Sequence, residues 1–269
     1  MHNFENVLEI TSAQNERVKR AEKLKNRRDR NKTGSFLVEG YRELLRCIEA
    51  GWEIEELFFA PSLFLKTNEP ALIEKSNAEL VRLKESIFQK LSYRDRPDGL
   101  LAIVKQQKKA IDDLEKVKNP FYIVAESIEK PGNLGTILRS SDAAGTDGVI
   151  VTDPCTDIFN PNVVRASIGT LFTQPVVVAN NQETEAFLSG RNIQVVAASP
   201  HAKKEFTHEN LTGPVAVIVG SEQYGLSDTW YKRADLHVKI PMRGKADSLN
   251  VAQATTLLLY EILRQRDGS

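Results

Sequence analysis

Residues 121–145, FYIVAESIEKPGNLGTILRSSDAAG, contain the turn on which the fold of the second half of this chain depends. An apolar run, FYIVA, ends at Ala125, and a glycine-rich turn then leads into a helical pattern that carries one arginine, Arg139. Nucleotide-binding loops have this form, with backbone amides that surround a phosphate. These glycines therefore bind either phosphate or another group that needs close backbone approach.

The spacing of the glycines disfavours phosphate. A dinucleotide fingerprint requires G-x-G-x-x-G followed by an acidic residue about 20 positions later, and this spacing does not occur in the chain. A second stretch, 220-GSEQYGLS-227, has the two glycines of a phosphate loop but places Leu226 where that loop has its lysine. Without the lysine, the phosphates lose their point-charge partner.

Short apolar runs recur through the second half of the chain, separated by segments of helix length. Such runs predict an α/β domain, in which helices cover both faces of a parallel sheet. The runs are FYIVA (121–125), GVIV (148–151), PVVVA (175–179), IQVVAAS (193–199), PVAVIVG (214–220) and LHVKI (236–240). From Leu249 to Arg266, apolar residues at helical spacing predict a final amphipathic helix with Ser248 as its N-cap.

The first half predicts a smaller α/β domain. Four apolar runs predict strands, and helical spacing after the first of them predicts a helix that ends at Gly51. The runs are SFLVEG (35–40), IEELFFA (54–60), AELVRL (78–83) and GLLAIV (99–104). A polar, charged stretch follows and predicts a linker. We therefore expect an N-terminal domain over residues 1–106, a linker over 107–118 and a C-terminal domain over 119–269.

The overall composition is that of a globular protein without a charge bias. The chain has 269 residues, with 36 Lys and Arg against 36 Asp and Glu. Its two cysteines, Cys47 and Cys155, are far apart and have no nearby histidine, so neither a disulfide framework nor a metal site is expected. No signal peptide and no membrane-spanning run is found, which predicts a cytoplasmic protein without a membrane partner.

Positive charge concentrates near the N-terminus, in residues 12–34, which we call the basic segment. It holds nine Lys or Arg and three Asp or Glu. An arm or helix of this kind suits an anionic polymer such as RNA. A solvated surface helix with surplus charge explains the pattern equally well.

Three segments share one design, in which a strand is followed by a loop rich in Gly, Pro, Ser and Asn and then by a helix. They are 129-EKPGNLGTILRSSDAAG-145, 217-VIVGSEQYGLSD-228 and 240-IPMRGKADSLNVAQA-254. Together they resemble the motifs of the SpoU/TrmH family, knotted methyltransferases of the SPOUT superfamily that methylate the ribose 2′-hydroxyl of RNA. The patterns N-x-G-x-x-x-R, G-x-E-x-x-G-L-S and I-P-M-x(5)-S-L-N-V occur in order within residues 120–265.

The resemblance implies a trefoil knot in the C-terminal domain, S-adenosylmethionine as methyl donor, no metal, and a homodimer whose active site draws on both subunits. It also implies that the N-terminal domain binds RNA. By family correspondence, Gly220, Ile240 and Leu249 hold the donor through backbone groups and packing on the adenine. The donor carries a sulfonium and an adenosine but no phosphate, so glycines and aliphatic walls suit it.

Arg139 corresponds to the catalytic arginine of the family. Some members are proposed to use it as a base, but a guanidinium with a pKa above about 12 rarely releases its proton. We therefore expect Arg139 to hold the adjacent phosphate and stabilise the attacking oxygen. We expect Asn133 and Glu222 to hold Arg139, and Ser248 and Asn250 to shape the loop around donor and ribose. Helix capping and turn formation are alternative roles for Ser248 and Asn133.

Three further residues either depart from the family pattern or have two possible roles. Gln223 and Tyr224 stand where the family often has glycine, and their bulk could narrow the loop. Arg165 lies in 160-NPNVVRASIGTLF-172, which resembles the helix after the family's second strand. It either contacts RNA or binds a carboxylate.

The leading hypothesis is an RNA ribose 2′-O-methyltransferase. Ribosomal (23S) RNA is preferred over transfer RNA because the N-terminal domain and its basic segment resemble members that act on large-subunit RNA. The alternatives are a tRNA ribose methyltransferase, a base methyltransferase of another branch of the superfamily, and a non-catalytic RNA-binding protein that keeps the knotted domain.

Overall fold

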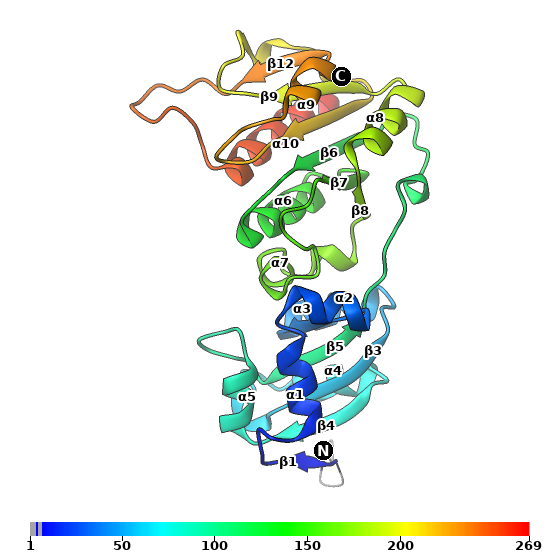
Figure 1. Cartoon of the computed structure of the whole chain (residues 1–269), viewed down its shortest axis with the longest axis vertical. Coiled ribbons are helices and arrows are strands. Elements are labelled where there is room, and N and C mark those ends of the chain that lie inside the picture. The colour runs from blue at the N-terminus through cyan, green and yellow to red at the C-terminus, as the bar shows by residue number, and fades with distance from the viewer. Residues whose placement is uncertain (1–3, 5–6, 269) are drawn as a thin grey trace. The chain divides into compact units, whose positions relative to one another are not determined.

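The computed structural model describes Phe4 and residues 7–268. Contacts divide the chain into two compact units (Figure 1). Unit 1 comprises Met1–Gln107 and Asp157–Thr173, and unit 2 comprises Lys108–Thr156 and Gln174–Ser269. The α/β class expected for both halves is confirmed.

A mixed five-stranded sheet forms the centre of unit 1, in the order β1-β4-β3-β5-β2. β5 runs antiparallel to both β2 and β3, and the other pairs are parallel. The strands are β1 (Glu9–Ile10), β2 (Ser35–Glu39), β3 (Ile54–Phe59), β4 (Glu79–Leu83) and β5 (Leu100–Lys105). The last four coincide with the four apolar runs, whereas the two-residue strand β1 was not expected.

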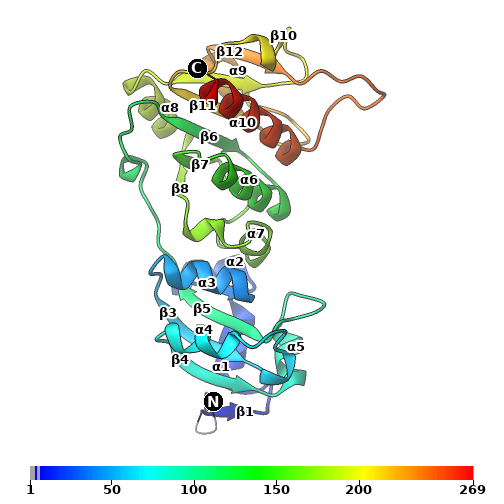
Figure 2. The same cartoon turned by 180° about the vertical axis from the view of Figure 1, so that it is seen from behind.

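Helices surround this sheet, and most of them bury apolar side chains. The helical spacing after β2 forms α3, as predicted. The helices of unit 1 are α1 (Glu16–Lys23), α2 (Arg27–Thr33), α3 (Tyr41–Glu49), α4 (Glu69–Lys75), α5 (Glu85–Leu91) and α7 (Pro161–Ala166), with short 3₁₀ turns at Pro61–Leu63 and Thr170–Phe172. Figures 1 and 2 show the two sides of this arrangement.

The segment Asp157–Thr173 belongs to unit 1 by its contacts, although the sequence places it between two strands of unit 2. Phe159 packs on Phe36 with ring centroids 4.8 Å apart. Phe172 packs on Trp52 with centroids 5.1 Å apart. These aromatic contacts explain why the segment joins unit 1, since burying such large rings contributes more to stability than most other contacts.

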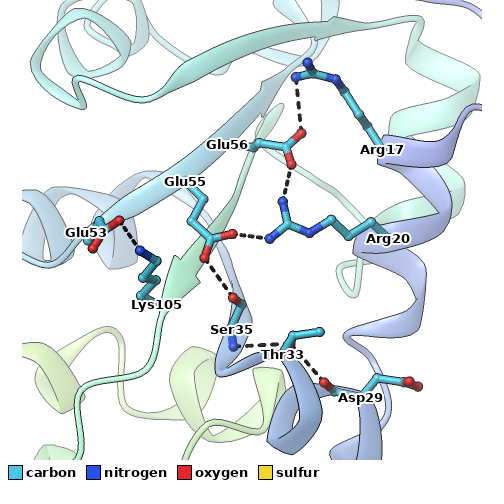
Figure 3. A network of polar contacts seen from close by, with 9 residues as sticks. All are labelled: Arg17, Arg20, Asp29, Thr33, Ser35, Glu53, Glu55, Glu56 and Lys105. Carbon is cyan, nitrogen blue, oxygen red and sulfur yellow. Dashed lines mark hydrogen bonds and ion pairs between the residues drawn. The ribbon is translucent and has the colours of Figure 1, made fainter.

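The basic segment forms α1, α2 and the turn between them, and several of its cations are paired within unit 1. Figure 3 shows Arg17 and Arg20 of α1 aimed at the carboxylates of β3. Arg17 Nη1 lies 3.4 Å from Glu56 Oε2, and Arg20 Nη1 lies 2.5 Å from Glu56 Oε1. Arg20 also pairs with Glu55, and Arg17 with Glu79. These ion pairs hold α1 against the edge of β3 and β4.

Arg30 of α2 is buried, with 1% of its surface exposed. Its Nε donates to Asp157 Oδ2 at 2.8 Å, and its Nη1 donates to the carbonyl oxygens of Leu24 and Lys25 at 2.9 and 2.8 Å. RNA contact and a solvated surface helix were the two alternatives for the basic segment, and the buried Arg30 fits neither of them. Its guanidinium is enclosed and its charge is neutralised inside unit 1.

An all-parallel seven-stranded sheet forms unit 2, in the order β10-β12-β9-β11-β6-β7-β8. The six predicted strands are all present, and the two-residue β10 is additional. The strands are β6 (Phe121–Glu126), β7 (Gly148–Thr152), β8 (Val176–Ala179), β9 (Gln194–Ala198), β10 (Lys204–Glu205), β11 (Val215–Val219) and β12 (Leu236–Lys239). The buried parallel sheet agrees with the short aliphatic runs.

Helices lie on both faces of the sheet (Figures 1 and 2). Phe187 of α8 and Trp230 of α9 join Tyr122 and Val124 of β6 in one core. On the other face α6 packs along α10, where Ser140 Oγ and Thr256 Oγ1 lie 2.7 Å apart. The helices are α6 (Pro131–Ala143), α8 (Asn181–Gly190), α9 (Asp228–Arg233) and α10 (Val251–Asp267), with a 3₁₀ turn at Ile111–Asp113 and another at Phe206–His208.

The last helix begins later than the sequence predicted. Asn250, not Ser248, is its N-cap, because Asn250 Oδ1 accepts a hydrogen bond from Ala252 N at 3.0 Å. The predicted cap at Ser248 is therefore wrong, and residues 240–250 form an extended loop before α10. Within the described part of the chain, the helices are all too short or too polar to cross a bilayer.

Strand order changes direction at β6. From β6 the chain continues to β7 and β8 on one side, and later strands are added beyond β11 on the other. In open parallel sheets, ligands bind beyond the carboxyl ends of strands at such a point. The loops after β6 and β11 and the loop before α10 are the three motif loops.

Candidate active site

A cavity of about 790 Å³ lies at the carboxyl ends of β9, β11 and β12. The loop after β11, the loop before α10 and the first turns of α10 complete its wall. Gly220, Ile240 and Leu249, the three residues predicted to hold the donor, all line it. The size suits a drug-sized or nucleoside-sized ligand.

Gly220 permits the tight fold of the loop after β11. A Cβ atom at this position would lie 2.2 Å from the carbonyl oxygen of Gly225, which no side chain tolerates. The loop closes on itself, since Gly225 N donates to Ser221 O at 3.0 Å and Tyr224 N donates to Ser221 Oγ at 3.0 Å. Gly225 has a φ of 71°, a conformation that favours glycine. The two glycines thus shape a turn and do not surround a phosphate.

The charge of the cavity wall disfavours an anionic ligand. Among the described residues that line it are the carboxylates Glu222 and Asp247, but neither lysine nor arginine. Apolar side chains form much of the rest, including Val219, Val238 and Leu258. A sulfonium joined to an adenosine fits apolar walls with nearby carboxylates, whereas a phosphate would be repelled.

The three motifs meet in one polar cluster beside the cavity. Asn133 at the start of α6 donates through Nδ2 to Glu222 Oε1. Asn250 donates through Nδ2 to Glu222 Oε1 at 2.8 Å and to Asn133 Oδ1 at 3.1 Å. Asn133 and Asn250, which lie 117 positions apart, are thus joined by a side-chain hydrogen bond and through Glu222.

Lys130 is a member of this cluster that the sequence reasoning missed. Its Nζ lies 2.5 Å from Glu222 Oε2, and this contact raises the pKa of Lys130. The ion pair and the two amide donors hold the Glu222 carboxylate in one orientation. The only sequence signal is its position directly before the Pro-Gly-Asn turn.

Arg139 does not join the cluster within one chain. Six positions separate it from Asn133, which corresponds to about 240° around the helix axis. Arg139 is exposed on α6, and among the described residues no hydrogen bond joins it to Asn133 or Glu222. The predicted hold of these two residues on Arg139 is therefore absent within the chain, because their side chains bond to each other and to Asn250.

Three other residues singled out from the sequence, Ser248, Arg165 and Tyr224, lie outside the polar cluster. Ser248 lines the cavity, and its Oγ donates to Asp247 Oδ1 at 3.4 Å. Arg165 is exposed, and its Nη1 donates to the backbone carbonyl of Tyr93 at 3.3 Å, so this contact is to neither a carboxylate nor RNA. Tyr224 is 78% exposed at the rim of the cavity.

An all-parallel α/β sheet with a largely apolar pocket beyond the carboxyl ends of its strands is the arrangement in which many enzymes bind a nucleoside cofactor. The model of the SpoU rRNA methylase family matches residues 120–260, and that of the MRM3-like substrate binding domain matches residues 15–102. The chain belongs to the SpoU rRNA methylase family.

Several similar proteins match nearly the whole chain. The 23S rRNA (uridine(2479)-2′-O)-methyltransferase of Streptomyces viridochromogenes is 31% identical over 250 residues, covering 90% of this chain and 87% of the relative. The crystal structure of an RNA 2′-O ribose methyltransferase is 38% identical with a TM-score of 0.87, covering 96% of this chain and 99% of that one. The structure of AviRb from S. viridochromogenes in complex with AdoMet is 30% identical with a TM-score of 0.88, covering 95% and 100%. The class is thus S-adenosylmethionine-dependent RNA 2′-O-ribose methyltransferase.

Proposed function

We propose that this protein methylates a ribose 2′-hydroxyl of 23S ribosomal RNA, with S-adenosylmethionine as donor. The observation that carries the proposal is the cavity that Gly220, Ile240 and Leu249 line beside the joined motifs. The S. viridochromogenes relative acts on 23S rRNA, and the match to a substrate-binding domain supports a large RNA acceptor. A ribosomal RNA acceptor agrees with the cytoplasmic location expected from the sequence.

The residues around the cavity have different roles in the proposed reaction. When bound, the donor supplies an electrophilic methyl group on a positively charged sulfur. Asp247 favours that charge by Coulomb attraction in a wall that is otherwise largely apolar, whereas the charge of Glu222 is offset by Lys130. The amide side chains of Asn133 and Asn250 fix Glu222, so that little reorganisation is needed when the acceptor ribose arrives.

We also propose that the protein is a homodimer in which Arg139 serves the cavity of the second subunit. Arg139 is exposed and does not line the cavity of its own chain. On α10, Leu257 and Tyr260 are 45% and 49% exposed, which provides apolar surface for a second copy. A permanently charged guanidinium from that copy would hold the phosphate next to the target ribose and stabilise the attacking oxygen. The trefoil knot and the domain limits 1–106, 107–118 and 119–269 remain part of this proposal.

A transfer assay tests the proposed reaction. Purified protein, methyl-labelled donor and 23S rRNA should give labelled RNA in which the modified linkage resists alkali, since a 2′-O-methyl group blocks hydrolysis. Label without alkali resistance would indicate base methylation, and greater transfer to tRNA would indicate the other acceptor. Binding of RNA without any transfer would favour the non-catalytic alternative.

Mixed dimers test the role of Arg139. Arg139→Ala alone should lower the transfer rate by about 10² to 10³, with donor affinity unchanged, because the guanidinium faces the acceptor. After equal mixing and exchange of Arg139→Ala chains with Gly220→Val chains, transfer should recover to about a quarter of the wild-type rate. The reason is that half of the dimers then hold one complete site out of two. No recovery would show that Arg139 acts in its own chain.

A further inference from the structure

The loop over residues 92–98 joins α5 to β5 and projects from unit 1 in both views (Figures 1 and 2). Hydrogen bonds to buried carboxylates fix both of its ends. Tyr93 N donates to Glu39 Oε2 at 2.7 Å, and Tyr41 N donates to Asp98 Oδ2 at 2.8 Å. The loop is therefore anchored on the end of β2 and the start of α3, although it has no regular structure of its own.

Arg94 lies on the inner side of this loop. Its Nη2 pairs with Glu43 Oε1 at 2.8 Å and donates to the carbonyl oxygen of Glu39 at 2.9 Å. Gly40 makes room for it, because a Cβ there would lie 2.1 Å from Arg94 Nη2. Burial raises the pKa of both Glu39 and Glu43, and the cation beside them opposes this shift. The inner charges are thus largely satisfied within the protein.

Further cations lie on the loop and next to it, and two of them contact Tyr93. Arg165 Nη1 donates to Tyr93 O at 3.3 Å. Lys25 Nζ lies 5.1 Å from the Tyr93 ring centroid and donates to Lys90 O at 3.3 Å. Arg42 is the second residue of α3 and follows Tyr41, whose N–H donates to Asp98. The exposed cations, which we call the loop surface, are Arg42, Lys90, Arg96 and Arg165.

Acidic side chains near the loop surface only partly offset it. Glu22 pairs with Lys25, their Oε2 and Nζ being 2.9 Å apart, so these two charges cancel. Asp95 is exposed at the loop itself, whereas Glu39, Glu43 and Asp98 are buried behind it. The solvent side therefore carries four cations against one unpaired carboxylate.

We propose that the loop surface binds the phosphate backbone of the RNA acceptor. Guanidinium groups match phosphate oxygens in pairs, and an anchored loop loses little conformational freedom on binding. Arg165 comes from the stretch matched by the methylase family yet packs in unit 1, so both matched stretches contribute to this surface. The inference rests on the proposed function, since it assigns a place for that RNA.

Charge removal tests the proposal on the full-length protein. Arg96→Gln with Arg165→Gln deletes two cations and keeps polar side chains of similar length. Lys66→Gln with Lys75→Gln deletes two exposed cations elsewhere on unit 1 and serves as the matched control. The affinity for 23S rRNA is measured over a series of KCl concentrations, together with the affinity for S-adenosylmethionine.

The log-log salt slope should decrease in magnitude by about 1.4 to 1.8 in the Arg96/Arg165 variant, because each lost contact removes about 0.7 to 0.9. The control pair should leave the slope unchanged, and donor affinity should be equal in all proteins. An unchanged slope in the Arg96/Arg165 variant, or an equal decrease in the control, would overturn the proposal. If the loop surface bound an acidic protein in place of RNA, the slope of the Arg96/Arg165 variant would be unchanged. Methyl transfer by the wild type, measured in the same preparation, tests the proposed function separately.

Discussion

The motif loops of unit 2 and the basic segment of unit 1 both concentrate distinctive side chains, but they satisfy them in different ways. In unit 2, Asn133, Glu222 and Asn250 bond to one another beside an open cavity. In unit 1, Arg20 and Arg30 pair with carboxylates of their own unit. A guanidinium can be satisfied by any carboxylate that the fold brings near, so a count of charges says little about a partner. A glycine-dependent turn at a strand end has far fewer possible uses.

The largest effect that we expect concerns Arg30, a cation of the basic segment that is buried and ion-paired within unit 1. Arg30→Gln should lower the free energy of unfolding by about 3 to 5 kcal/mol, because it leaves the Asp157 carboxylate buried without a cation. The loss is measured as the shift of the urea midpoint of the full-length protein. Arg28→Gln, an exposed neighbour on α2, is the matched control and should not shift the midpoint. Equal midpoints for the two variants would mean that the buried Arg30–Asp157 ion pair contributes no net stability.

A smaller effect is expected at Gly220 of unit 2, where the site depends on the shape of the backbone and not on a charge. Gly220→Val should weaken S-adenosylmethionine at least about tenfold, since its Cβ would lie 2.2 Å from Gly225 O and the loop must open. Gly244→Val is the matched control in the loop before α10, because no atom lies within 4 Å of its Cβ position. Isothermal titration measures both affinities. If the two variants bind the donor equally well, the cavity is not the donor site.

Much of both sheets was predictable because short aliphatic runs have few other uses in a globular chain. The exceptions are β1 and β10, two-residue strands that exist only through pairing with β4 and β12. The place of residues 157–173 could not be predicted either. It depends on the packing of Phe159 and Phe172 against Phe36 and Trp52, and such distant contacts leave no periodic signal.

The site residues were predictable to the extent that a motif fixes them. The three cavity residues and the Asn133, Glu222 and Asn250 cluster follow the motif pattern. The contact of Lys130 with Glu222 spans most of unit 2, so local sequence could not reveal it. The position of Arg139 away from Asn133 follows from their spacing of six residues on α6, which the sequence already gives.

The smallest effect that we expect concerns exposed cations of the basic segment. It tests directly whether this segment contacts RNA or serves only the structure of unit 1. Lys23, Arg28 and Lys32 are exposed on α1 and α2. If α1 and α2 are solvated helices held by internal ion pairs, replacing these three residues by Gln should leave the salt slope of RNA binding unchanged. A phosphate-tracking arm would instead lose about 0.7 to 0.9 of slope for each contact removed.

The salt slopes of the triple variant and the Arg96/Arg165 variant together distinguish the two candidate RNA surfaces. The triple variant and the Arg96/Arg165 variant both remove charge from unit 1, but only the second removes charge from the loop surface. A slope that falls only in the Arg96/Arg165 variant would place RNA on the loop surface and leave the basic segment a structural role. A slope that falls only in the triple variant would place RNA on α1 and α2, in spite of the internal pairing of Arg17 and Arg20. Because donor affinity should be the same in both variants, the result reports on RNA contacts alone.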